Sequence, residues 1–317
     1  MRRVVATLLA LSGLSFSGGA AAQSAPPAAE AGQRASPAQG LSATADFFYS
    51  ADKDETEVMR YGLDLRLGRD ADRYLGLRAE RARYNPGGTG WQSRERIYLE
   101  AADRFAGWHL NARVGSDGDS LIGAVTLNDD SPFRKEFFIE RDIVETRLGL
   151  EQGLYHLFAG AAIDLPVNER NLFTALAGLQ TFTGRNERLH LRGSYIHVLQ
   201  PELGLSAQLR IRYFHSSEPR EYDYYSPRWY VEALPVLQLR RFRGGWQMLA
   251  AVGLGAQRES ASGWRLSRFA NARLRSPASA GWRFEGTFTY SSSGGGIASS
   301  AIGYSYTQFT LGVTRAF

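Results

Sequence analysis

From residue 41 to the C-terminus, polar and apolar side chains alternate with a period of two, in short segments separated by clusters of turn-forming residues. In the segment RYGLDLRLG (60–68), the tyrosine and the leucines fall on one face, and Arg60, Asp64 and Arg66 fall on the other. A helix has a period of 3.6 residues and would mix the two sets around its circumference, whereas a strand separates them. The pattern therefore predicts an all-β chain of short amphipathic strands.

About sixteen strands are expected from the positions of the turn-forming clusters. They lie at 41–50, 58–68, 73–84, 93–102, 108–115, 120–127, 135–150, 155–165, 171–182, 188–199, 205–215, 228–241, 246–258, 265–276, 282–291 and 303–317. Residues 135–150 could instead form two short strands around Arg141–Asp142, which would give an odd number. Bacterial single-chain outer-membrane barrels have an even number of strands, so we predict one long strand there.

The connections between these strands predict a transmembrane antiparallel up-and-down β-barrel over 41–317. Every second connection is short, whereas those on the other side include the long loops 216–227 and 292–301. Outer-membrane barrels have this asymmetry, with short turns in the periplasm and longer loops outside. Trp108, Trp246 and Trp282 each begin a strand after a short turn, where interfacial aromatic girdles lie. The alternative is a soluble two-sheet sandwich, whose exterior would need fewer arginines than the polar faces carry.

The N-terminal residues have the three parts of a secretory signal. Arg2 and Arg3 precede an apolar run that is too short to anchor the chain, and small residues follow it. We therefore expect a signal peptide at 1–22, a flexible linker rich in Ala, Pro, Gly and Ser at 23–40, and the barrel at 41–317. This topology predicts the outer membrane of a Gram-negative type of cell.

Several kinds of chemistry are missing from the sequence. It contains no cysteine, Gly-rich phosphate loop or zinc-binding histidine pair, and its five histidines are scattered singly. We therefore expect no metal, no cofactor and no nucleic-acid partner. One enzymatic alternative remains, because His215 and Ser217 lie two residues apart near the predicted outer rim, as in an outer-membrane hydrolase.

If the apolar faces contact lipid, the polar faces line a lumen that is rich in arginine. The predicted path for a substrate comprises Arg60, Asp64, Arg66, Arg94, Arg96, Glu100, Arg188, Arg192, Arg210, Arg212, Arg228, Glu232, Arg265, Arg273 and Arg275. Guanidinium groups in a wet channel favour anions and can bind sugar hydroxyls and carboxylates. Equally, any of these residues could brace the barrel wall through ion pairs.

A group of aromatic residues lies at the predicted outer mouth. Tyr222, Tyr224, Tyr225 and Tyr230 fall close together in SSEPREYDYYSPRWY. Because aromatic faces stack on sugar rings, this loop could contact a polysaccharide. It could also be an interfacial aromatic belt.

The last strand resembles the C-terminal strand of general porins and their relatives. LGVTRAF ends on Phe317 with apolar residues at alternate positions before it. The resemblance implies that Phe317 is the signal read by the barrel-insertion machinery. Arg315 departs from the pattern, because an aromatic residue usually occupies its place, but a long arginine can extend to lipid headgroups.

Four stretches resemble the barrels of outer-membrane proteins that export exopolysaccharides, of the cellulose-secretion and poly-N-acetylglucosamine-secretion kinds. They are FFIERDIVET (137–146), YYSPRWYVEALP (224–235), GGWQMLAAVGLG (244–255) and SPASAGWRFEG (276–286). The resemblance implies a sixteen-stranded pore that conducts a polymer without catalysis. In that family a superhelix of periplasmic tetratricopeptide repeats precedes the barrel, whereas only the linker 23–40 precedes it here. We therefore expect outer-membrane lipid and a polysaccharide, either anionic or neutral, as partners. The missing superhelix implies either a separate periplasmic scaffold or a pore with another function. A general or solute-specific porin is the alternative.

Overall fold

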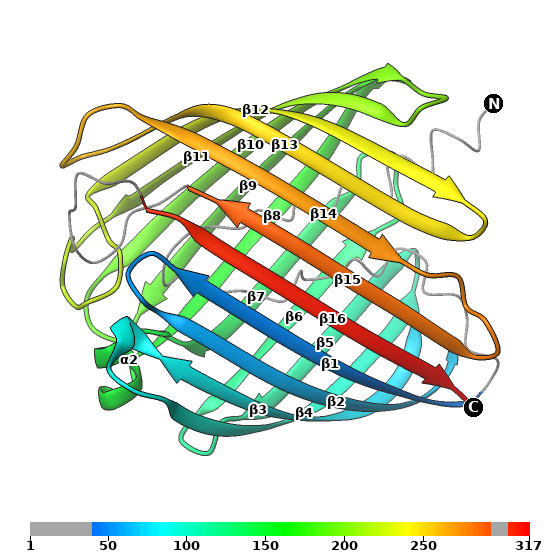
Figure 1. Cartoon of the computed structure of the whole chain (residues 1–317), viewed down its shortest axis with the longest axis horizontal. Helices are drawn as coiled ribbons and strands as arrows, with labels where there is room; N and C mark the ends of the chain where they lie inside the picture. Colours follow the sequence, from blue (N-terminus) through cyan, green and yellow to red (C-terminus); the bar gives the residue numbers. More distant parts are fainter. Residues whose placement is uncertain (1–39, 71, 293–303) are drawn as a thin grey trace.

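The computed structural model describes residues 40–70, 72–292 and 304–317, which form one closed barrel of antiparallel strands (Figure 1). In chain order the strands are β1 (Gly40–Asp52), β2 (Glu57–Asp70), β3 (Arg73–Asn85), β4 (Gln92–Phe105), β5 (Trp108–Ser116), β6 (Leu121–Asp129), β7 (Lys135–Ile143), β8 (Tyr155–Asn168), β9 (Asn171–Phe182), β10 (Glu187–Gln200), β11 (Leu205–Ser216), β12 (Trp229–Arg243), β13 (Trp246–Glu259), β14 (Arg265–Arg275), β15 (Trp282–Ser291) and β16 (Tyr306–Ala316). Each strand pairs with the next, and β1 pairs with β16 to close the cylinder. The predicted sixteen-stranded up-and-down barrel is confirmed.

The prediction of one long strand at 135–150 is wrong in its second half. β7 ends at Ile143, and a short helix, α2 (Arg147–Gln152), follows it. The side chain of Thr146 caps this helix by accepting a hydrogen bond from the Gly149 amide, and Gly153 ends it in the left-handed conformation (φ 67°). These caps satisfy helix-end groups that a strand would have paired with a neighbour. The even strand number is unaffected. A single 3₁₀ turn, η1 (Pro86–Gly88), lies between β3 and β4.

The two faces of each strand differ as the alternation predicts. On β2, Leu63, Leu65 and Leu67 are 51, 47 and 68% exposed on the outside of the barrel, whereas Asp64 is 3% exposed on the inside. Because the cylinder is closed, the apolar set faces the lipid and the polar set faces the lumen. Among the described residues, no helix has the length and apolar character needed to cross a membrane.

Both ends of the barrel can be assigned to a side of the membrane. Ser42 at the start of β1 pairs with Ala316 at the end of β16, so the chain enters and leaves the barrel at one end, opposite α2 (Figure 1). Connections at the end that holds the termini are short, as at Gly244 and Gly245, both with positive φ in a two-residue hairpin turn. This end is periplasmic in barrels with an even number of strands, and we call the opposite end the outer mouth. The predicted signal peptide 1–22 and all but the last residue of the linker 23–40 lie outside the described residues.

The periplasmic end of β16 shows how the chain accommodates Arg315. Its guanidinium lies over the rings of Trp282 and Phe317, at 5.2 and 5.7 Å from their centroids. The Phe317 amide donates to the Leu41 carbonyl, so the terminal residue is held against β1. Arg315 thus extends the aromatic girdle at this interface.

Candidate functional site in the barrel lumen

Ion pairs cover the inner face of β1 to β5 and reach β7 and the residues just after it. We call this group the acid–arginine network; it comprises Asp46, Arg60, Asp64, Arg66, Arg78, Glu80, Arg96, Glu100, Arg113, Asp142 and Glu145. Arg78 contacts Asp46 at 2.6 Å, Asp64 at 3.0 Å and Glu80 at 2.7 Å. Arg96 in turn contacts Glu80 at 3.3 Å and Asp142 at 3.0 Å. Arg66, Arg78 and Arg96 are thus each shared by at least two carboxylates that come from different strands, which braces this half of the wall.

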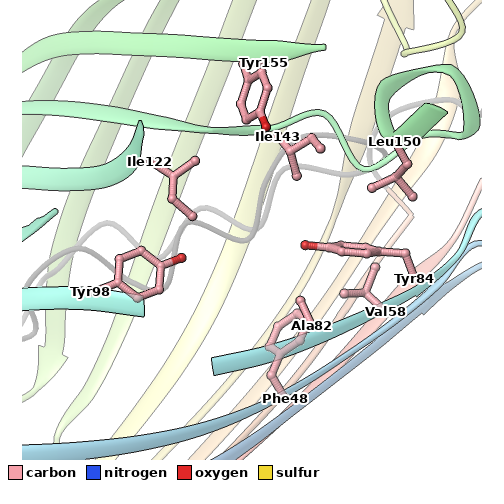
Figure 2. Packing of buried hydrophobic residues seen from close by; sticks show 9 residues of the cluster. All are labelled: Phe48, Val58, Ala82, Tyr84, Tyr98, Ile122, Ile143, Leu150 and Tyr155. Atoms are coloured by element: carbon pink, nitrogen blue, oxygen red, sulfur yellow. The ribbon is translucent and has the colours of Figure 1, made fainter. Parts of the chain in front are cut away.

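The chain between β7 and β8 folds into the outer mouth. We call residues 144–154 the inward segment. Its Glu145 pairs with Arg60 of β2, and the carbonyl of Leu150 accepts a hydrogen bond of 3.0 Å from Arg94 of β4. The Leu150 side chain joins a cluster of buried residues that includes Val58 and Tyr84 on the inner face of β2 and β3 (Figure 2). The segment therefore narrows the mouth from the β7 side.

A second loop, residues 217–228, holds the inward segment in place. Asp223 accepts hydrogen bonds from Thr146 Oγ1 at 2.5 Å and from the Leu148 amide at 2.8 Å. Tyr224 stacks on Phe182 of β9, with ring centroids 4.3 Å apart and planes at 10°. Burial raises the pKa of Tyr224 to about 12, so its phenol stays protonated at neutral pH. The predicted aromatic loop is therefore part of the closure of the mouth.

Aromatic rings line the inner face from β7 to β12. We call this group the aromatic platform (Phe138, Phe158, His190, Phe214 and Tyr230). Successive centroids are separated by 5.0, 4.9, 5.7 and 5.1 Å. Phe138 and Phe158 are half-buried, whereas the other three rings are buried.

Two glycines allow the rings of Phe138 and Phe158 to lie against the barrel wall. A Cβ at Gly160 would meet the Phe138 ring at 2.6 Å, and a Cβ at Gly178 would meet the Phe158 ring at 2.6 Å. Gly160 and Gly178 are cross-strand partners on β8 and β9. Each ring therefore covers a glycine of the adjacent strand, which orients part of its surface toward the lumen.

The arginines beside the platform differ from those of the acid–arginine network. Arg188 lies over the rings of Phe182 and Phe214, 5.1 and 4.7 Å from their centroids. Its guanidinium donates to Ser216 Oγ and to the Tyr225 carbonyl. No carboxylate of the described residues forms an ion pair with it. Arg188 is therefore a cation of the inner wall whose hydrogen-bond partners among the described residues are neutral.

The other predicted lumen residues are placed as follows. Arg212 contacts Glu232 at 3.3 Å and Tyr230 at 3.0 Å, Arg210 donates to Gln208, Arg265 pairs with Glu259, Arg273 and Arg275 share Glu285, and Arg192 lies on the inner face of β10. Arg228 differs, because it is exposed at the outer rim before β12 begins. Whether these side chains form a substrate path stays a prediction.

The predicted excess of arginine over acid does not hold on the β1 to β7 side. Asp46, Glu80, Asp142 and Glu145 were not among the predicted residues, yet they neutralise the arginines there. Alternation along one strand shows which face a residue occupies, whereas pairing depends on the register between strands. The ion-pair alternative therefore describes this half of the lumen.

The tyrosines and the rim histidine also have defined places. Tyr230 stacks on Phe214 inside the barrel and Tyr225 donates to Glu259, so neither belongs to a lipid-facing belt. His215 and Ser217 are both exposed at the rim, and Ser217 Oγ accepts a hydrogen bond from the Glu187 amide. The structure gives no hydrogen bond between this serine and the histidine among the described residues, as a nucleophile and its base would need.

Sequence reasoning missed Phe138 and Phe158 as site residues. Both stand at lumen-facing positions of predicted strands, but an isolated phenylalanine in a strand carries no functional signal by itself. The available clue is the cross-strand pair of glycines next to them, Gly160 and Gly178. Recognising it requires the register of β7 to β9.

Comparison with known proteins agrees on the fold. No family model and no curated protein matches the sequence. A solved structure described as a bacterial polysaccharide outer membrane secretin matches with a TM-score of 0.67 and 14% identity, covering 88% of this chain and 99% of that one. OccK5 (OpdH) and OprD of Pseudomonas aeruginosa match with TM-scores of 0.44 and identities of 10 and 9%, covering 89 and 87% of this chain and 99 and 94% of theirs. The chain is a sixteen-stranded β-barrel protein of the outer membrane of a Gram-negative type of cell.

Proposed function

We propose that the barrel is a pore that carries a polysaccharide across the outer membrane without chemistry, and that the polymer slides along the aromatic platform. The observation that carries the proposal is the pair Phe138 and Phe158, whose rings lie over glycines and face the lumen. A pyranose ring presents apolar C–H groups that stack on such surfaces. Stacking tolerates any register along a polymer, so it guides the chain without fixing it.

Polar groups next to the platform suit the hydroxyls of a sugar. His190 shares a hydrogen bond with Gln180 at 3.0 Å, and Arg188 lies between the rings of Phe182 and Phe214. A surface on which aromatic rings alternate with hydrogen-bond donors suits a sugar, because a sugar ring is apolar on its face and carries hydroxyls at its edge. The solved barrel described as a polysaccharide secretin shares the fold, which is consistent with the proposal.

The charge of the polymer is a finer part of the proposal. Arg188 supports an anionic polymer at the β10 and β11 side of the lumen. On β7, in contrast, three acidic residues lie on the same inner face as Phe138: Glu136, Glu140 and Asp142. We propose that an acidic sugar is held on the arginine side while its ring contacts the platform.

A solute-specific porin is the second candidate, and one observation favours it. The inward segment 144–154 narrows the mouth through Glu145 and Leu150. A constriction of this kind selects small solutes by size and charge. The two functions differ in whether a long polymer can enter.

The test is single-channel recording of the refolded full chain in a planar bilayer, with neutral, anionic and cationic oligosaccharides of equal length. Phe138→Ala and Phe158→Ala each remove one of the two half-buried rings of the aromatic platform. Phe137→Ala is the matched control, because Phe137 is the adjacent residue on β7 and is 48% exposed on the lipid side.

The proposal predicts current blocks by oligosaccharides, longest for the anionic one. Stacking on one aromatic ring contributes about 1 kcal/mol, so each platform variant should shorten the blocks about fivefold while the Phe137 variant leaves them unchanged. Large currents that no oligosaccharide blocks would contradict the proposal and favour a porin. Equal shortening in all three variants would show that the rings act through barrel stability alone.

Three partners remain proposals that follow from this assignment. Insertion would use the general barrel-insertion machinery, with Phe317 at its exposed position as the recognised residue. Outer-membrane lipid would surround the apolar face. A separate periplasmic scaffold would deliver the polymer, which co-purification of the full chain from its own cells would test.

A further inference from the structure

Two arginines stand on the lipid-facing side of the barrel near the outer mouth. Arg258 of β13 and Arg268 of β14 occupy outward positions in strands whose other outward residues are apolar, among them Leu254 and Leu266. Both arginines are exposed, and neither belongs to the lumen described above. An outward charge at the edge of the apolar band is unfavourable unless it reaches a polar partner.

No acidic side chain of the neighbouring strands supplies that partner. The acids of β12 to β15 are Glu232, Glu259 and Glu285, and all three occupy inward-facing positions of their strands. Arg258 and Arg268 form no ion pair with any carboxylate of the described residues. Their charges are therefore uncompensated by the protein.

Another outward arginine at the same end shows the contrast. Arg81 of β3 lies 3.3 Å from Glu95 of β4, and both side chains are on the lipid-facing side. That pair cancels its own charge. At the outer end of β3, Arg83 also faces outward without an ion pair among the described residues, and its guanidinium lies over the Trp91 ring, 5.0 Å from the centroid. The β13 to β14 sector differs because it places two such arginines on neighbouring strands.

Aromatic residues place the patch at the level of the lipid headgroups. Arg258 lies over the Trp229 ring, 5.7 Å from its centroid, and Trp264, which directly precedes β14, is 61% exposed. Indole rings concentrate at the membrane interface. We call Trp229, Arg258, Trp264 and Arg268 the outer-leaflet patch.

The strand register determines how far apart Arg258 and Arg268 lie along the membrane normal. Arg268 pairs with Leu254, four residues along β13 from Arg258. Four residues in a strand tilted by about 40° correspond to about 10 Å of depth. Arg268 would therefore extend upward along the apolar surface toward the headgroups, with Arg258 at their outer edge.

We infer that the outer-leaflet patch binds a phosphate group of a phosphorylated outer-leaflet glycolipid, clamped between Arg258 and Arg268. Guanidinium groups pair with phosphate oxygens in a planar, bidentate geometry. Acyl chains of the same molecule would pack on Leu254, which is level with Arg268, and on Val252 below it. The inference depends only on the outward face and is independent of what passes through the lumen.

The test uses the full chain purified in a neutral detergent, and native mass spectrometry counts the lipid that stays bound. The probes are bisphosphorylated lipid A, the same lipid A with both phosphates removed, and inorganic phosphate. The variants are Arg258→Gln, Arg268→Gln and the double variant, with Arg81→Gln as the matched control. Heat-modifiable migration on a gel verifies that each variant is folded.

The inference predicts that bisphosphorylated lipid A binds the unmodified chain, and that the double variant binds it at least tenfold more weakly. The Arg81 variant should bind it unchanged, and dephosphorylated lipid A should bind weakly to all proteins. Equal binding of the two lipid A forms would overturn the inference, as would unchanged binding by the double variant. Displacement of the lipid by equimolar inorganic phosphate would also overturn it, because the site would then recognise a free anion.

Discussion

Replacing Asp223 by alanine tests how the outer mouth is closed. Asp223 joins loop 217–228 to the inward segment through Thr146 Oγ1 and the Leu148 amide, at 2.5 and 2.8 Å. Hydrogen bonds to a charged group contribute about 1.5 to 3 kcal/mol each. Because Asp223 is partly exposed, we take the lower value, which gives about 3 kcal/mol for the pair.

This loss should appear as local opening of the inward segment while the barrel stays intact. A change of 3 kcal/mol corresponds to about a 150-fold change in an equilibrium constant. Hydrogen exchange of the amides of 147–153 should therefore accelerate about 150-fold in Asp223→Ala, whereas the amides of β2 and β3 keep their protection.

Glu218→Ala is the matched control for this experiment. Glu218 carries the same charge on the same loop, and its described hydrogen bond uses its backbone amide, which donates to Asn186. Exchange in 147–153 should not change in this variant. If Asp223→Ala and Glu218→Ala gave the same exchange rates, the two hydrogen bonds would not hold the segment, and the reasoning would be wrong.

Three further predictions concern the wall, the outer loop and the terminus. Gly123→Ala should lower the free energy of unfolding by more than about 1 kcal/mol, because φ is +146° and a Cβ would lie 2.1 Å from the Arg113 carbonyl; Gly312→Ala, where a Cβ meets nothing within 4 Å, is the control in urea titrations. Burial raises the pKa of Tyr224 to about 12, against about 10 in an unfolded chain. The contribution of Tyr224 to the stability of the loop is therefore full below about pH 10 and is lost as the pH rises toward about 12. In a titration followed by tyrosinate absorbance, Tyr224→Phe should remove one phenol that ionises late. Deleting Phe317 should reduce the amount of barrel in outer-membrane fractions several-fold while leaving refolding in detergent intact, because the residue is 68% exposed at the end of the chain.

The barrel itself could be predicted because its signal is local. A period of two over many segments, with an even strand number, fixes which side chains face lipid and which face the lumen. Bounds agreed with the structure to within a few residues in most strands, for example at β9, predicted and found at 171–182. Each strand needs only its own sequence for this prediction.

The inward segment could not be predicted by the same means. The stretch 135–150 alternates well enough to continue as a strand, and its helix depends on Thr146, Gly149 and Gly153 together. A Cβ at Gly149 would lie 2.0 Å from the Val144 carbonyl, so the turn needs glycine there. Contacts with Asp223, far along the chain, add a tertiary contribution that no local pattern contains.

The sequence predicted which types of residue face the lumen, but it did not predict which of them contact one another. Most of the predicted arginines lie on the inner face, whereas Arg228 lies at the outer rim. Their partners come from other strands, as the contact of Arg96 of β4 with Asp142 of β7 shows. The aromatic platform depends on register too, because Phe158 lies over Gly178 of the next strand. Predictions of this kind need the cross-strand geometry before the chemistry can be assigned.

The most direct test of polysaccharide transport is polymer release from liposomes that contain the full chain. The liposomes would hold a labelled polysaccharide and a small sugar of a different label, and efflux of both would be followed together. The account predicts that the polymer leaves, and that Phe138→Ala with Phe158→Ala slows its efflux severalfold while the small sugar leaves at an unchanged rate. Efflux of the small sugar with complete retention of the polymer would contradict the account and identify the barrel as a porin.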